Sequence, residues 1–337
     1  MPRLIKRALF AVVAISVVGI VSGVIYEQWS RWQVANKNAP PGRMVEVDGH
    51  KLHLNCTGSG SPTVIFESGS GMNASLQFVL IQPELAKSHR VCTYDRAGMM
   101  WSERRDGTPS AVQIADDLHS LLENASEPPP YVMVGYSLGG LFIRVYAHQY
   151  PQDVAGMVFV EPSHPEQRER YASIEGGEPY KYPRWTRLKQ RVLIETGLFR
   201  LFGLVAYDTL PSEAMIANDF VPYSFVAFVA QELARPQFDT EAAGASSFDD
   251  MPILVLTGGL LVVPATPEEA ADMSPEEVRI WNEKARLHYQ LHAEIAGLST
   301  NSEHRVVDGS GHSMSNEVPE AVVLGVQDFL AKCCGDE

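Results

Sequence analysis

Short apolar runs that each end in a turn containing glycine or serine recur along most of this chain, and they restrict its fold more than any other feature. Six such runs occupy residues 62–71, 90–98, 131–137, 155–163, 251–259 and 304–312. Segments with the apolar spacing of helices separate several of them, namely 115–125, 141–150 and 319–332. Strands and helices in this order build a mostly parallel sheet with helices on both faces. The sequence therefore predicts an α/β fold, with reacting groups beyond the carboxyl ends of the strands.

Length and charge limit what the chain can be. With 337 residues, 45% of them apolar, it can bury the core of one catalytic-size domain and still carry an appendage. Lys and Arg total 27 against 41 Asp and Glu, which gives a formal net charge of -14. Because nucleic acid is itself an anion, this charge argues against a nucleic-acid partner. The sequence gives no indication of the oligomeric state.

The appendage is an apolar segment near the N-terminus. Residues Ala8 to Tyr26 carry no charge and are just long enough to cross the hydrocarbon layer of a membrane as a helix. Three basic residues, Arg3, Lys6 and Arg7, precede this segment. By the positive-inside rule they keep the N-terminus in the cytoplasm and send the rest of the chain across the membrane.

This interpretation divides the chain into an anchor over residues 1–32, a linker over 33–44 and a catalytic domain over 45–337. The domain is expected to be extracytoplasmic and held to the membrane by one helix. The alternative is a signal peptide that is cleaved near residues 21–23 and releases a secreted domain.

A pair of cysteines gives an independent indication of the compartment. Cys56 closes one predicted strand, which follows a hairpin turn at residues 48–49, and Cys92 opens another. If these strands are antiparallel neighbours, the two side chains fall within disulfide range, about 4.4 to 6.8 Å between Cα atoms. Such a bond persists in an oxidising compartment. The alternative is two small buried side chains, and the adjacent Cys333 and Cys334 are too cramped to bridge each other easily.

The run YVMVGYSLGG, Tyr131 to Gly140, ends in a serine between glycines. Gly135 to Gly139 has the pattern G-x-S-x-G and lies after a predicted strand and before a predicted helix. This context is typical of a nucleophile elbow, a sharp turn that presents a serine hydroxyl at the tip of a strand. Ser137 is therefore the candidate nucleophile. The alternative is a simple glycine-rich turn.

A serine hydroxyl is a weak nucleophile until a base takes its proton. His312 lies in the loop between the last predicted strand and the last helix, from which its ring can reach the strand tips. His304 comes before that strand, at its wrong end. Capping or surface roles are expected for histidines on helical stretches, which are His119, His148, His288 and His292. No pair shows metal-ligand spacing with a supporting Cys or Asp, so we expect neither a metal nor another cofactor.

Four motifs resemble, in order and spacing, those of the α/β-hydrolase superfamily: DRAG at 95–98, GYSLGG at 135–140, VEPSHP at 160–165 and GSGH at 309–312. The resemblance covers about residues 45–332 and implies an eight-stranded sheet, a Ser-acid-His triad and a cap inserted over the site. It also supports pairing the strands that carry Cys56 and Cys92. The chain departs from the family pattern at Met100, where a second glycine is usual, and at Glu161, where Asp is commoner.

Glu161 is the predicted acid of the triad because it follows a strand at its carboxyl end. A carboxylate there can accept the Nδ1 proton of His312, hold its tautomer and stabilise the imidazolium. Many members of the superfamily carry the acid after the strand that is 251–259 in this chain, where no carboxylate occurs until Glu268. The alternatives are Glu268 or Glu269 reaching back, and Asp308 near its own histidine.

Acyl transfer also requires N–H donors for the developing oxyanion. The elbow places the backbone N–H of Leu138. The loop at residues 67–71 can offer a second donor, and the resemblance puts it at Ser70. The alternative reading of that loop is a flexible turn.

An insertion at about residues 163–250 interrupts the alternation of strands and helices. Its segments 180–207 and 220–234 have helical spacing and many Phe, Leu and Val residues. We expect a helical cap with one face on the core and another lining an acyl pocket. Amphipathic helices that rest on the membrane are the alternative.

These features favour a serine hydrolase that cleaves carboxylic esters with an apolar acyl or alcohol part through an acyl-enzyme. A serine at the elbow argues against the alkyl-enzyme route of related dehalogenases and epoxide hydrolases, because those enzymes use an aspartate at this position. Amidase or peptidase, thioesterase and acyltransferase activities use the same machinery and are alternatives. A protein of this fold that only binds a ligand is the alternative from a different class. The expected partners are a small-molecule ester and, through the N-terminal helix, a membrane.

Overall fold

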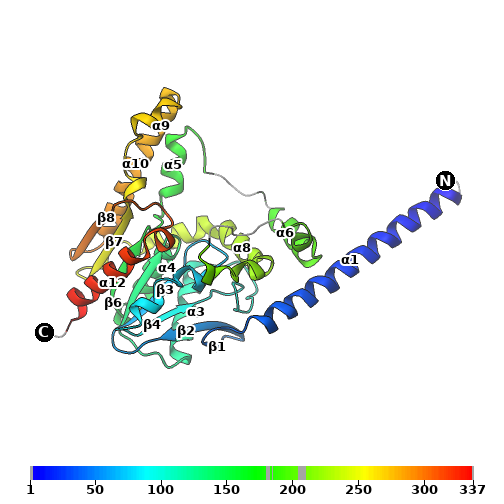
Figure 1. The fold of residues 1–337 in the computed structure, drawn as a ribbon, viewed down its shortest axis with the longest axis horizontal. Helices are drawn as coiled ribbons and strands as arrows, with labels where there is room; N and C mark the ends of the chain where they lie inside the picture. The colour runs from blue at the N-terminus through cyan, green and yellow to red at the C-terminus, as the bar shows by residue number, and fades with distance from the viewer. Residues whose placement is uncertain (1–2, 180–182, 184, 204–209, 336–337) are drawn as a thin grey trace.

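The computed structural model describes residues 3–179, 183, 185–203 and 210–335 of the chain. Its centre is one eight-stranded sheet with the strand order β1-β2-β4-β3-β5-β6-β7-β8 (Figure 1). The strands are β1 (Arg43–Val47), β2 (His50–Thr57), β3 (Thr63–Glu67), β4 (Val91–Tyr94), β5 (Tyr131–Tyr136), β6 (Val154–Val160), β7 (Ile253–Gly258) and β8 (Ser302–Val307). β2 is antiparallel to β1 and β4, and the other pairs are parallel. The prediction of a mostly parallel α/β sheet is confirmed.

Two apolar cores, one on each face, hold the sheet. Because side chains alternate along a strand, Met133 and Phe159 join one core while the neighbouring Val132 and Val158 join the other. Helices that contribute to the first core are α3 (Ala111–Asn124), α4 (Gly139–Gln149), α8 (Ala217–Gly244) and α10 (Pro275–Ala296). Helices on the second are α2 (Gln82–Leu85), α11 (Met314–Glu317) and α12 (Pro319–Cys334). Both faces of the central strands are therefore buried, as continuous apolar runs require.

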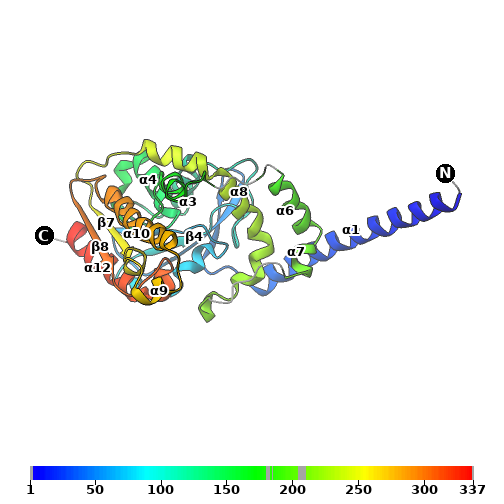
Figure 2. The ribbon, with the colours of Figure 1, turned by 90° about the horizontal axis from the view of Figure 1, so that it is seen from above.

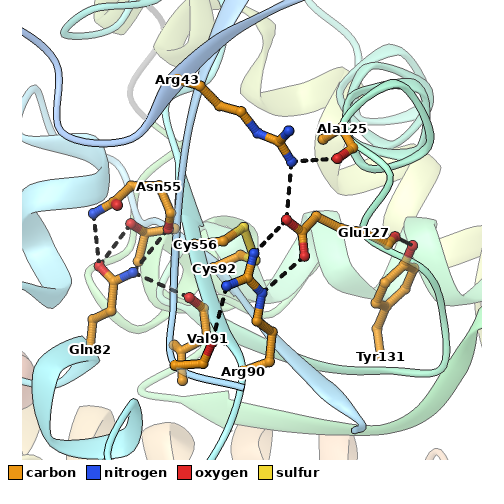
Figure 3. Close-up of a disulfide and its surroundings, with 12 residues drawn as sticks. Arg43, Asn55, Cys56, Gln82, Arg90, Val91, Cys92, Ala125, Glu127 and Tyr131 are labelled. Atoms are coloured by element: carbon orange, nitrogen blue, oxygen red, sulfur yellow. Dashed lines mark hydrogen bonds and ion pairs between the residues drawn. A yellow bond between two sulfur atoms is a disulfide. The ribbon is translucent and has the colours of Figure 1, made fainter. Parts of the chain in front are cut away.

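The antiparallel edge of the sheet carries a disulfide. Cys56 on β2 and Cys92 on β4 are direct partners across the two strands, and their sulfur atoms are bonded (Figure 3). Beside them Glu127 accepts hydrogen bonds from Arg43 and Arg90, so two cations hold one carboxylate next to the bond (Figure 3). The prediction of this disulfide is confirmed.

A second disulfide joins the adjacent Cys333 and Cys334. The expectation that these two residues are too cramped to bridge each other is wrong. They are the last two residues of α12.

The chain between β6 and β7 is largely helical. It contains α5 (Gln167–Ile174), α6 (Thr186–Glu195), α7 (Leu198–Leu201), η3 (Ser212–Ala214) and α8. We call residues 161–252 the insertion. The predicted cap helices fall on α6, α7 and α8, except for residues 180–182, 184 and 204–207, which lie outside the described residues. The short elements elsewhere are η1 (Ala74–Phe78), η2 (Pro151–Asp153), η4 (Gly259–Leu261) and α9 (Pro267–Ala271).

The N-terminal helix α1 (Arg3–Lys37) is a single element of 35 residues, long and apolar enough to cross a membrane. It projects from the domain on the side that carries α6 and α7 (Figure 1; Figure 2). The helix continues past Trp32, where we placed the end of the anchor. It does so because its last turns pack on the domain: Val34 contacts a core cluster that includes Met100 and Phe220. Only residues 38–42 separate α1 from β1.

Candidate active site

Ser137 follows β5 directly and has a backbone φ of 51°, in the left-handed region that side chains other than glycine rarely adopt. Its N–H donates to Val160 (3.0 Å) and its carbonyl accepts from Ser163 (2.8 Å), so the end of β6 holds the strained residue in place. The turn also needs the glycines on either side. A Cβ on Gly135 would lie 2.8 Å from the carbonyl oxygen of Gly139, and one on Gly139 would lie 2.3 Å from that of Glu67.

Three side chains that are far apart in the sequence meet beyond the ends of β5 and β6. The Oγ of Ser137 lies 3.1 Å from Nε2 of His312. The other ring nitrogen, Nδ1, lies 3.2 Å from Oε2 of Glu161. The hydroxyl of Tyr136 donates to the backbone carbonyl of His312 and thereby fixes the loop that carries the ring. The serine, imidazole and carboxylate therefore form a continuous hydrogen-bonded chain.

Glu161 is held in the ionised state although it is buried. The backbone φ of Glu161 is 48°, and only 1% of the residue is exposed. Its Oε1 accepts a hydrogen bond from the N–H of Gly258. Burial raises the pKa of a carboxyl group, but the hydrogen bonds from His288 and His312 outweigh it and lower the pKa of Glu161 well below its ordinary value. A buried carboxylate that stays charged can orient His312 and stabilise its protonated ring.

Two further histidines lie beside Glu161. The Nε2 of His288 is 3.2 Å from Oε2 of Glu161, and its Nδ1 is 2.8 Å from the hydroxyl of Tyr171. His292 bonds Thr257 through Nδ1 (2.7 Å) and the carbonyl of Pro162 through Nε2 (2.9 Å). Burial lowers the pKa of His292 to about 3, so this ring is neutral at physiological pH.

The prediction that His288 and His292 have capping or surface roles is wrong, since both are buried. Their spacing of four residues places both rings on one face of α10, the face that packs on β7. That spacing was the available signal in the sequence. Only the fold shows that this face meets the end of β6.

Glu161, His288 and His292 also offer potential metal ligands, with ligand atoms within 4.8 Å of one another. Each ring nitrogen of the two histidines already has a hydrogen-bond partner in the protein. The cluster is thus explained by hydrogen bonding around the carboxylate. A second group of potential ligands, made of His164, Glu166 and Glu294, lies at the surface, where Glu294 pairs with Arg170.

The loop after β3 approaches Ser137 closely. A Cβ on Gly69 would lie 3.1 Å from Cβ of Ser137. Next to it, Ser70 donates its hydroxyl to Glu232 of α8. Among the described residues, no hydrogen-bond acceptor is found for the backbone N–H of Ser70 or for that of Leu138. The two N–H groups that we expect to bind an oxyanion therefore have no described acceptor within the protein.

Arg96, which follows β4, holds this loop from behind. Its guanidinium pairs with Glu67 and donates to the carbonyls of Ser68 (2.7 Å) and Gly69 (2.7 Å). Tyr94 also donates to Glu67. Burial raises the pKa of Glu67 even though the Arg96 charge opposes this rise. Arg96 is itself only 3% exposed, so its planar guanidinium is buried among the loop residues to which it donates.

We expect Arg96→Gln to lower the free energy of unfolding by about 3 to 5 kcal/mol, because it leaves the Glu67 carboxyl buried without its cation. Urea unfolding of the full chain in detergent, followed by far-UV circular dichroism, measures this. The double variant with Glu67→Gln removes both charges and should be more stable than Arg96→Gln alone. A loss below about 1 kcal/mol in Arg96→Gln would show that the pair does not hold the loop.

The other proposed acids do not reach His312. Glu269 accepts hydrogen bonds from Thr266 in the capping box at the start of α9, which accounts for its carboxylate. The side chain of Glu268 lies outside what the structure describes. Asp308 is exposed and makes no described contact with His312. Of the carboxylates whose side chains are described, Glu161 is the one that bonds this ring.

Two cavities lie on the side of the insertion. One of about 130 Å³ lies between Arg96, residues 104–109 and α8, and one of about 330 Å³ lies between α1, Trp101 and Tyr223. Neither is lined by Ser137 or His312. The His312 side chain is 55% exposed, whereas Ser137 is buried with 9% exposed.

Comparisons with known proteins concern the family and the fold. A family model described as the alpha/beta hydrolase fold matches residues 62–203. The uncharacterized protein YqjL of Bacillus subtilis is 30% identical over 299 residues, which is 88% of this chain and 95% of that protein. The 2-hydroxy-6-oxo-2,4-heptadienoate hydrolase of Pseudomonas putida is 31% identical over 129 residues, 38% of this chain and 46% of that enzyme. In three other curated relatives the match spans only 62%, 18% and 28% of their own lengths.

Solved structures share the fold. An esterase from Thermogutta terrifontis superposes with a TM-score of 0.56 and 19% sequence identity, over 86% of this chain and 98% of that one. At this level of identity the likeness concerns the fold alone.

Proposed function

Because this chain belongs to the α/β-hydrolase superfamily, we propose that it is a serine hydrolase that cleaves carboxylic esters. The observation that carries the proposal is the hydrogen-bonded chain from Ser137 through His312 to Glu161, with distances of 3.1 and 3.2 Å. These are the contacts that a nucleophile, its base and the acid that orients the base require. The strained turn at Ser137, with a φ of 51°, also supports the proposal, because a nucleophile elbow holds its serine in such a turn.

In this proposal the neutral ring of His312 takes the proton of Ser137 as Oγ attacks the ester carbonyl. The oxyanion that forms accepts hydrogen bonds from the N–H groups of Ser70 and Leu138. His312 then gives its proton to the leaving alcohol, and an acyl-enzyme remains on Ser137. In the second half, His312 takes a proton from water as the water oxygen attacks the acyl group. His312 then returns this proton to the Oγ of Ser137 as the bond to Oγ breaks and the acid leaves.

The setting of the site supports an ester with an apolar part. The insertion brings α8 against the loop that holds Ser70, through the contact of Ser70 with Glu232. Near this contact the described side chains of α8 include Phe225, Val226, Phe228 and Val229. We propose that the insertion acts as a cap whose apolar residues accept the acyl or alcohol chain.

We also propose that α1 anchors the enzyme to a membrane with the catalytic domain on the extracytoplasmic side. Arg3, Lys6 and Arg7 ahead of the apolar segment support this orientation. The Cys56–Cys92 disulfide supports an oxidising compartment. The packing of α1 on the insertion favours a retained anchor over a cleaved signal peptide, because cleavage near residues 21–23 would remove part of that contact.

A second candidate follows from the heptadienoate hydrolase relative, whose name describes hydrolysis of a 2-hydroxy-6-oxo-diene acid. That relative matches only 38% of this chain, so the ester remains the first candidate. The same serine and histidine would serve either reaction.

Turnover assays distinguish these candidates. We expect the full chain in mild detergent to hydrolyse p-nitrophenyl esters, with kcat/KM rising from acetate toward medium or long acyl chains. Activity on matched p-nitroanilides and acyl thioesters should be lower by at least about tenfold, which corresponds to about 1.4 kcal/mol of barrier. Turnover of the dienoate but of no ester would instead support the second candidate, and absence of all turnover would contradict both.

A further inference from the structure

One face of α1 packs against the insertion, and this contact extends into the apolar segment. The buried and half-buried positions of the helix are on its C-terminal half, at Gly23, Glu27, Ser30, Arg31 and Val34. Steps of three or four residues connect Gly23 to Glu27, Glu27 to Ser30 and Arg31, and Arg31 to Val34, which places them on one face. The other positions from Ala8 to Tyr26 are exposed, as a helix surrounded by lipid would require.

The contact at Gly23 is backbone against backbone. A Cβ on Gly23 would lie 2.1 Å from the carbonyl oxygen of Thr196, and one on Gly197 would lie 2.8 Å from that of Gly23. One turn further along α1, Glu27 is fully buried and accepts from Arg31 (2.9 Å) and from Arg200 of α7 (3.0 Å). The junction of α6 and α7 is therefore fixed to α1 at the level of Gly23 to Glu27.

That level is inside the segment that we propose crosses the membrane. The uncharged run from Ala8 to Tyr26 has 19 residues, and a helix needs about 20 to span the hydrocarbon layer. The whole run, including Gly23, is therefore needed for the crossing. At a rise of about 1.5 Å per residue, Gly23 lies about 4.5 Å deeper than Tyr26. Whatever touches Gly23 must then lie at the boundary between the hydrocarbon and the headgroups.

The part of the insertion that meets α1 exposes large apolar side chains on both sides of the contact. On and after α7, Leu198 is 36%, Leu201 67% and Phe202 67% exposed. At the N-cap of α6, Trp185 is 60% exposed, and on the helix Leu188 is 67% and Val192 50% exposed, at helical spacing. We call these six residues the outer cap surface. Lys189 and Arg191, also exposed, stand between them and suit the phosphates of lipid headgroups.

We propose that the outer cap surface lies in the interface of the membrane that α1 crosses, and that the hydrolase takes its ester substrates from that bilayer. The occupant of this surface is lipid because its residues flank the junction that is fixed to α1 at Gly23 and Glu27, beside the exposed apolar surface of that helix. The second part of the proposal rests on the proposed esterase function, whereas the first part does not.

Quenching by brominated lipid tests the position of the surface. The full chain is placed in phosphatidylcholine nanodiscs whose acyl chains carry bromine near the headgroup, and an indole is added by Phe202→Trp. The matched control is Val306→Trp, at an exposed apolar position on β8 at the far edge of the sheet. We expect the fluorescence added at position 202 to fall at least about twofold while that at 306 is unchanged. Equal quenching at both positions would overturn the proposal, whether or not the protein is an esterase.

Activity tests the source of the substrate. The double variant Leu201→Glu with Phe202→Glu should lose at least tenfold of its rate on a long-chain ester dissolved in the nanodisc, and keep its rate on water-soluble p-nitrophenyl acetate. Leu324→Glu, on the exposed side of α12, is the control and should keep both rates. Quenching at position 202 with no loss on the dissolved ester would overturn the second part. A wild-type protein without turnover of either ester would overturn that part together with the proposed function and leave the quenching result to decide the first.

Discussion

Ser137→Ala is expected to lower kcat for p-nitrophenyl esters by at least about 10⁴-fold, because no other group can form the acyl-enzyme. Alanine removes only the hydroxyl that lies 3.1 Å from His312. The strained backbone at this position, with a φ of 51°, costs alanine about what it costs serine, so the variant should fold normally. Steady-state kinetics with matched circular dichroism spectra measure the effect.

Ser163→Ala is the matched control for this variant. Ser163 contacts Ser137 through its backbone N–H at 2.8 Å, and that bond survives the substitution. We expect its kcat to stay within about threefold of the wild type, a difference below 1 kcal/mol in barrier. Retention of activity in Ser137→Ala would remove the serine from the mechanism.

Glu161→Gln is expected to lower kcat by about 10³- to 10⁴-fold, because an amide no longer holds the tautomer of His312 or stabilises its protonated ring. Glu269→Gln is the control, since Glu269 is the alternative acid and is engaged in capping α9. We expect the control to keep its turnover. The opposite pattern, with activity lost in Glu269→Gln and kept in Glu161→Gln, would transfer the role to Glu269.

The same variant has a second readout in the pH dependence of stability. The pKa of Glu161 is lowered in the folded protein, so its carboxylate stabilises the fold fully above its unfolded pKa of roughly 4.3. This stabilisation is lost as the pH falls below that value. The difference in free energy of unfolding between the wild type and Glu161→Gln should therefore be largest near neutral pH and shrink below about pH 4. A constant difference from pH 7 to pH 3 would contradict the lowered pKa.

The parts of the site that depend on local sequence are the parts that sequence analysis predicts. The apolar run, the glycines around Ser137 and the following helix all act within ten residues, so their pattern implies the turn. The position of His312 after the last strand follows from the order of the elements in a parallel sheet. The structure brings these two residues into contact, and their catalytic roles remain predictions.

Other features depend on which surfaces meet in the folded chain. His288 and His292 occupy one face of α10, but the sequence does not show that this face packs against the end of β6. Likewise, Arg96 is visible as part of the DRAG motif, while its bonds to the carbonyls of Ser68 and Gly69 exist only once β3 and β4 are neighbours. Such contacts across elements have no local pattern from which to predict them.

The packing of α1 on the insertion is another contact between elements that the sequence does not predict. A hydropathy pattern predicts that Ala8 to Tyr26 can cross a membrane, but the side on which Gly23 meets Thr196 is a property of the folded domain. For that reason the sequence leaves the roles of α6 and α7 open between core packing and membrane contact. The depth of the contact is what favours the membrane.

The central claim is that Ser137 is a nucleophile activated by His312, and covalent labelling tests it most directly. The full chain is incubated with a fluorophosphonate, digested, and analysed by mass spectrometry for the modified peptide. We predict one phosphonylated residue, Ser137, in the wild type and at least a hundredfold slower labelling in His312→Gln. A label on a different residue, or equal labelling rates with and without His312, would contradict the claim.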